Sequence, residues 1–183
     1  MIGALLGLAL ALSLPPSVKP WPIGAEPGYR LPAASVRVLA GRRTGRFRCG
    51  GDAGRFGVHV EVFARRRVVI VPAAIGVARP SRTSFARVRP GGCTYPLRTL
   101  DPTGVVEVRA DVRATLGDFF ALWGQRLGPQ RLASFHGVVL AFVGGRRWQG
   151  DPRRIPLARH AQIVLAIGGY VPPHPQYLFP PGL

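Results

Sequence analysis

CTYPLRTLDPTGVVEV, residues 93–108, is the stretch that decides most of the fold. It starts with a cysteine, continues through DPTG, whose Asp, Pro and Gly are typical of a turn, and ends in the strand-forming residues VVEV. We therefore expect a corner of the fold here, with a covalent end at Cys93, a turn at 101–104 and a core strand at 105–108.

The segments around this corner predict a sheet. VHVEVF (58–63) alternates along the chain and is separated from VVIVP (68–72) by the polar ARRR, which predicts a hairpin. VVLAFV (138–143) and RRWQG (146–150), joined by GG, predict a second hairpin, and AQIVLAIG (161–168) predicts a last strand.

One amphipathic helix is predicted between the corner and the second hairpin. Thr115 and Asp118 have the spacing of a capping box, and Gly128-Pro129 is expected to end the helix. The apolar residues of its buried face are Leu116, Phe119, Phe120 and Trp123. The order of elements predicts an α+β fold, a mixed β-sheet with one main helix packed across it, close to a β-grasp.

The chain divides into four parts by composition. Residues 1–25 contain an uncharged apolar run that is too short to span a bilayer alone and predicts a signal peptide or an N-terminal anchor. Residues 26–48 are expected to be a Pro/Gly/Arg-rich tether, 49–170 a single domain with a loop at 76–92, and 171–183 a Pro-rich extended tail. We therefore expect a protein that is secreted or attached to the outer face of the cytoplasmic membrane.

The chain has two cysteines, Cys49 and Cys93, without a C-x-x-C motif or zinc-site spacing. An even pair in an exported protein is most simply one disulfide. Closing the loop between them would stabilise the fold by about 4 kcal/mol if the bond acts by restricting the unfolded chain. Two unrelated buried thiols are the alternative.

Composition gives a formal net charge of +17, carried by 24 Arg and one Lys against eight acids, in a chain that is 47% hydrophobic. The arginines are scattered and have no aromatic residues interleaved as a stacking platform, so no specific nucleic-acid binding is expected. The charge allows non-specific, salt-sensitive contact with anionic membrane or envelope polymers. The sequence identifies no other partner, and we infer no stable oligomer.

No catalytic residue is predicted. No serine lies in a G-x-S-x-G elbow, and no two of the eight acids have a recognised spacing for acid–base chemistry. GGRRWQG (144–150) lacks the lysine and the following helix of a phosphate loop. His136 and His174 are expected to be exposed or capping. We therefore expect a protein that is no enzyme and needs no cofactor.

Five blocks, in order, resemble an uncharacterised family of exported bacterial proteins and cover about residues 49–183. They are HVEVFARRRVVIVPAAIGV, CTYPLRTLDPTGVVEV, TLGDFFALWGQRL, GDPRRIPLARHAQIVLAIG and PPHPQYLFPPGL. In that family the first block typically reads H-x-H-x-H-L, the second reads C-x-Y-x-L-H-T-H-D-x-S-G-x-I-H, and a β-grasp-like C-terminal half follows. Clustered histidines of this kind imply a copper or zinc site.

This chain keeps few of those histidines. His59 matches the third histidine of the first block, while Arg55 and Gly57 stand at the first two. His160 matches a histidine before the last strand, and both cysteines match.

In the second block, Arg98 and Leu100 stand at the two histidines of the turn, Asp101 is kept, and Glu107 replaces the histidine of the next strand. We therefore expect no metal; if one bound, its ligands would be His59, Asp101 and Glu107. Arg98 could instead pair with Asp101 or Glu107, so that an ion pair replaces the metal.

These expectations favour a non-enzymatic, exported binding or structural module of the cell envelope. Two alternatives stay open: a weak transition-metal (Cu or Zn) binding protein with a degenerate site, and an Arg-rich binder of anionic surfaces, either lipid or nucleic acid.

Overall fold

The computed structural model describes residues 43–51, 53–78, 81–82 and 87–183. The predicted signal peptide and most of the predicted tether lie outside these residues. Within the described residues, no helix has the length and apolar character needed to cross a membrane.

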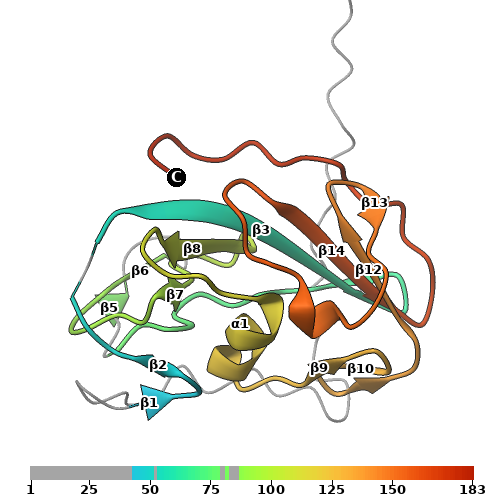
Figure 1. The fold of residues 1–183 in the computed structure, drawn as a ribbon, viewed down its shortest axis with the longest axis horizontal. Coiled ribbons are helices and arrows are strands. Elements are labelled where there is room, and N and C mark those ends of the chain that lie inside the picture. Colours follow the sequence, from blue (N-terminus) through green and yellow to red (C-terminus); the bar gives the residue numbers. More distant parts are fainter. Residues whose placement is uncertain (1–42, 52, 79–80, 83–86) are drawn as a thin grey trace, which may run out of the picture.

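A mixed sheet forms the main layer, with strand order β13-β12-β14-β3-β8-β7 and with β4 also paired to β3 (Figure 1). Its strands are β3 (Arg55–Ala64), β4 (Arg67–Val69), β7 (Leu97–Arg98), β8 (Val105–Arg109), β12 (Val139–Val143), β13 (Arg146–Arg147) and β14 (Gln162–Ile167). β14 runs parallel to β3, and the other pairs of this sheet are antiparallel. Both predicted hairpins, the strand after the DPTG turn and the last strand are therefore confirmed.

Helix α1 (Leu116–Trp123) packs across one face of this sheet (Figure 1). Thr115 and Asp118 form the predicted capping box, in which each side chain accepts from the backbone N–H of the other. The predicted end at Gly128-Pro129 is wrong, because Gly124 adopts the left-handed conformation, with φ 75°, and ends the helix after Trp123.

Short strands complete the fold. β1 (Arg43–Thr44) pairs with β2 (Phe47–Arg48), and β5 (Ser81–Arg82) pairs with β6 (Val88–Arg89). A small three-stranded sheet contains β9 (Leu127–Gly128), β10 (Arg131–Leu132) and β11 (Phe135–His136), and a 3-10 helix spans Pro152–Arg154. The predicted loop at 76–92 thus contains the β5–β6 pair. The predicted tether also overlaps folded structure, because Phe47 is buried in the main core.

The main core lies between α1 and the inner face of the sheet. The four predicted apolar residues of α1 are each at most 2% exposed. They share a cluster with alternate residues of β3, β8 and β14, namely Val58, Val60, Val62, Val106, Val108, Ile163, Leu165 and Ile167. This arrangement confirms an α+β fold in which one helix packs against a mixed sheet.

The other face of the sheet is covered by the C-terminal tail, residues 171–183, which runs across it on the side opposite α1 (Figure 1). Because successive side chains of a strand point to opposite faces, the residues of β3 that alternate with its core valines point toward the tail. They are Gly57, His59, Glu61 and Phe63. We call this surface the outer face.

Candidate functional site

Strand register gathers residues that are distant in the sequence on the outer face. Gly57 on β3 lies opposite Glu107 on β8, and Glu107 lies opposite Arg98 on β7. His59 lies opposite Val105 at the start of β8. Most of the predicted site residues therefore share one surface.

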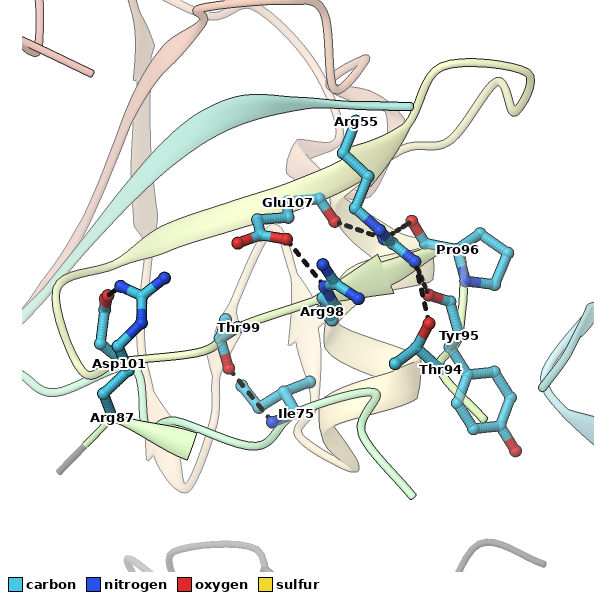
Figure 2. Close-up of polar contacts among 10 residues, drawn as sticks. All are labelled: Arg55, Ile75, Arg87, Thr94, Tyr95, Pro96, Arg98, Thr99, Asp101 and Glu107. Carbon is cyan, nitrogen blue, oxygen red and sulfur yellow. Dashed lines mark hydrogen bonds and ion pairs between the residues drawn. The ribbon is translucent and has the colours of Figure 1, made fainter. Parts of the chain in front are cut away.

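The sequence predicted Asp101 or Glu107 as the partner of Arg98, and in the structure Arg98 pairs with Glu107. Arg98 Nε donates to Glu107 Oε2 at 2.7 Å, and the two side chains are only 10% and 9% exposed (Figure 2). Asp101 accepts from Arg87 Nη1 at 3.0 Å, in a pair whose side chains are 24% and 57% exposed. One ion pair is therefore buried and the other is open to solvent.

The DPTG turn holds Asp101 in place. Its Oδ1 accepts from the backbone N–H of Thr103 at 3.4 Å and from the Thr103 hydroxyl. Gly104 has φ +84°, and a Cβ at this position would lie 2.6 Å from the Val60 carbonyl oxygen. The turn therefore requires glycine at position 104.

Arg55 ties β3 to the corner that precedes β7. Its Nη1 donates to the Pro96 carbonyl at 3.0 Å, and its Nη2 donates to the Tyr95 carbonyl and to Thr94 Oγ1, both at 3.1 Å (Figure 2). Several hydrogen bonds from one planar guanidinium give this corner a defined position.

The predicted disulfide between Cys49 and Cys93 is present, with a Cα–Cα distance of 5.5 Å. Next to it, Gly50 and Thr94 exchange backbone hydrogen bonds of 3.1 and 3.2 Å. The bond therefore joins the β1–β2 hairpin to the same corner that Arg55 holds.

Both ring nitrogens of His59 make hydrogen bonds in an environment that leaves the residue 5% exposed. Nδ1 lies 2.7 Å from Gln162 Oε1, and Nε2 lies 2.8 Å from the Thr103 carbonyl oxygen. Both ring nitrogens are therefore engaged by neighbouring groups of the protein.

The expected fallback metal ligands do not form a metal site. Among the described residues, no group of three or more His, Cys, Asp or Glu side chains is placed to hold a metal ion. His59 contacts Gln162, while Asp101 and Glu107 engage arginines. These contacts are those of structural residues.

The tail is tied to the outer face by aromatic and polar contacts. His174 Nδ1 lies 2.9 Å from Glu61 Oε2. The ring of Tyr177 stacks on His59, with centroids 3.7 Å apart. His174 is half-exposed, as expected, but it is engaged with an acid of β3.

Phe179 fills the space above Gly57. A Cβ at position 57 would lie 2.5 Å from Phe179 Cδ1. The Phe179 ring also stacks on His160, with centroids 4.9 Å apart, and His160 Nε2 donates to the Leu183 carbonyl at 2.7 Å. Gly57 stands where the resembled family has a histidine, and the Phe179 ring from the tail fills the space above it.

A cavity of about 450 Å³ lies between the DPTG turn and the tail, and we call it the tail cavity. Its lining residues are Ala53, Arg55, Arg87, Arg98, Leu100, Asp101, Thr103, Val105, Glu107, Tyr177 and the tail residues 180–183. The pair of Arg98 with Glu107 and the pair of Arg87 with Asp101 are both part of this lining.

Tyr177 is the aromatic residue of this lining. Burial raises the pKa of its phenol above the usual value, the charges of Asp101 and Glu61 raise it further, and a hydrogen bond with the Thr103 side chain opposes the rise. The phenol is therefore a neutral hydrogen-bonding group at physiological pH.

Sequence reasoning missed three residues of this surface: Arg87, Gln162 and Tyr177. Arg87 belongs to a stretch without hydrophobic period, and Gln162 precedes an apolar strand. For Tyr177 one signal was present, because aromatic residues in a Pro-rich tail need a surface on which to pack.

No protein-family model matches the chain, and neither a curated protein nor a solved structure is significantly similar to it.

Proposed function

We propose that this chain is a non-enzymatic binding module of the cell envelope and that the tail cavity is its binding site. The observation that carries the proposal is the concave site of about 450 Å³, whose lining combines charged side chains with apolar surface from leucine, valine and proline. A larger hollow of about 630 Å³ borders the tail, but no Asp, Glu, Arg or Lys lines it. The tail cavity thus offers the greater chemical specificity.

The arrangement of charges favours binding over catalysis. Around the tail cavity, Arg98 engages Glu107, and Asp101 engages Arg87. A general base must instead lie within reach of a nucleophile or of the substrate proton that it removes. Charges engaged in this way orient a ligand more readily than they transfer protons.

Export, as a secreted protein or one held at the outer face of the cytoplasmic membrane, is part of the proposal. It is supported by the bond between Cys49 and Cys93, because disulfides persist mainly in oxidising compartments. We also propose membership of the resembled family of exported proteins and a β-grasp-like topology. The latter is supported by the order hairpin β3–β4, helix α1, hairpin β12–β13 and a last strand, β14, parallel to β3.

A thermal-shift screen of the purified chain against small molecules from bacterial envelopes tests this function. A ligand at a hundredfold excess over its Kd should raise Tm by about 5–10 °C. Leu100→Trp, which fills the cavity, should abolish the shift, whereas Val138→Trp, at a position that is 64% exposed and outside the lining, should keep it.

Mass spectrometry of the recovered ligand completes the test, because a binding module returns it unchanged. Ligands that stabilise the Leu100→Trp variant as well as the wild type would place the site elsewhere. Turnover of a ligand would show an enzyme and contradict the proposal.

A further inference from the structure

The hollow of about 630 Å³ that borders the tail lies where the tail passes the end of β12 and the start of β14, and we call it the second hollow. Its lining consists of residues 143–144, 160–162 and 175–183. Among these described residues there is no Asp, Glu, Arg or Lys side chain. A charged ligand would therefore lose water without gaining one of these side chains as a partner, which costs free energy. The lining favours an uncharged ligand.

Rings of the tail supply much of the apolar surface of the second hollow. Tyr177 and Phe179 pack edge to face, with centroids 5.0 Å apart. Pro175, Pro180 and Pro181 add pyrrolidine rings to the same lining. Rings pack closely against a flat apolar surface, and the C–H face of a sugar ring is such a surface.

The second hollow also borders a buried amide that lacks one hydrogen bond. Gln162 is part of the lining and only 2% exposed, and its Oε1 lies 2.7 Å from His59 Nδ1. Its Nε2 has no hydrogen-bond partner in the part of the chain that the structure describes. An unsatisfied polar atom in a buried position costs free energy, and a ligand that supplies the missing partner recovers it.

A hydroxyl suits the unpaired end of this amide better than other uncharged polar groups. Turning the amide over exchanges Nε2 and Oε1, and the tautomer of His59 decides which of the two faces the ring. A hydroxyl can both donate and accept, so it completes the hydrogen bond in either arrangement. Gln176, an exposed amide of the same lining, offers hydroxyls a further partner.

The tail is held in a way that lets it admit a ligand. Nε2 of Gln162 is closed to solvent, so a ligand reaches it only when the neighbouring tail shifts. In the described part of the chain, no backbone–backbone hydrogen bond joins residues 171–183 to the sheet. Side-chain contacts, such as the stack of Tyr177 on His59, hold the tail instead, and these rearrange more easily than a strand ladder.

From these observations we propose that the second hollow binds an uncharged saccharide, with the C–H face of a sugar ring against the tail rings and a hydroxyl at Gln162. This site is additional to the tail cavity, with which it shares Tyr177 and residues 180–183. The inference goes beyond the proposed function and does not depend on it.

NMR titration of the full disulfide-bonded chain with uncharged trisaccharides tests the inference. The probes are cellotriose, mannotriose and triacetylchitotriose. At least one should bind with a Kd below ~10 mM and shift the side-chain amide signals of Gln162 and Gln176. Trigalacturonate, whose sugar rings carry carboxylates, and triproline, an uncharged peptide, should bind at least about tenfold more weakly.

Two variants test the named residues. Gln162→Met removes the amide at similar volume and should weaken the trisaccharide by about tenfold. Gln176→Ala, at an exposed position, should weaken it by about threefold. Gln130→Ala is the matched control, because Gln130 is an exposed amide outside the lining, and it should leave the affinity unchanged. Equal Tm values show that the variants are folded, and if Gln162→Met is not, Gln176→Ala and the amide signals of the wild type decide.

Three outcomes would overturn the inference. They are a failure of all three trisaccharides to bind up to ~20 mM, an equal affinity for trigalacturonate or triproline, and an equal effect of Gln176→Ala and Gln130→Ala. Leu100→Trp separates the inference from the proposed function, since it fills the tail cavity and lies outside the lining of the second hollow. This variant should keep its affinity for the trisaccharide; a loss would place the sugar in the tail cavity and make the second site wrong.

Discussion

Removing one partner of the buried ion pair should destabilise the fold far more than removing both. In Glu107→Leu, the guanidinium of Arg98 stays in place and loses an acceptor at 2.7 Å. The Arg98 side chain is only 10% exposed, so water compensates it poorly. Breaking a buried pair from one side costs about 3–5 kcal/mol, which we expect here.

The double variant Arg98→Met/Glu107→Leu removes both charges and keeps similar volumes. Apolar replacement of a buried pair is often neutral or stabilising, so we expect this variant to unfold within about 1 kcal/mol of the wild type. The exposed pair supplies the control: Arg87→Gln should cost less than about 1 kcal/mol.

Urea unfolding, followed by tryptophan fluorescence, measures these differences through the midpoint at constant m value. For a domain of this size, a loss of about 3–5 kcal/mol lowers Tm by roughly 10 °C. A cost of less than about 1 kcal/mol for Glu107→Leu, or a double variant as unstable as the single one, would contradict a buried and charge-dependent pair.

Three further predictions concern the disulfide, the tail and the helix cap. Replacing Cys49 and Cys93 by serine should lower the unfolding free energy by about 4 kcal/mol, and mass spectrometry without reductant should find the two linked in the wild type; free thiols there would contradict the bond. Gly57→Ala should release the tail, since its Cβ would lie 2.5 Å from Phe179, and limited digestion with chymotrypsin should then cut after Tyr177 faster than in the wild type; unchanged cleavage would mean that the tail adapts. Asp118→Asn should cost about 1 kcal/mol at neutral pH. Burial raises the pKa of Asp118, but hydrogen bonds from Arg46 and Thr115 outweigh it and lower the pKa overall, so this contribution is present above the unfolded value of about 3.9 and is lost as pH falls through the folded pKa. A difference from the wild type that persists below that pH would show that the charge of Asp118 does not cause it.

Local patterns were sufficient for the main strands and for the start of the helix. These features depend on residues that are only a few positions apart, so the sequence alone reveals them. They are the alternation of 58–63, the valines of 105–108 and the capping box of Thr115 and Asp118. The predicted helix end was wrong because two glycines of the sequence, Gly124 and Gly128, could each end the helix. Gly124 takes the left-handed conformation before the chain reaches Gly128, and position in the turn, not residue type, decides between them.

The site could be predicted only in part. Arg98 and Glu107 are nine positions apart, and a turn between two short strands is enough to place them face to face. The approach of Arg87 to Asp101 depends on a loop, and that of Tyr177 to His59 depends on where the tail lies. Neither contact follows from a sequence period.

The sequence by itself therefore determined an α+β chain with a disulfide, a capped helix and a set of outward-facing polar residues, because periodicity and turn chemistry are local properties. Only the tertiary structure decided what those residues do. The register of β3, β7 and β8 turned the expected ligand positions into a buried ion pair, and the tail, placed across the outer face, enclosed His59 and closed a cavity beside it. The contacts of the tail join segments that are distant in the sequence, and burial decides such contacts only when the whole chain is packed.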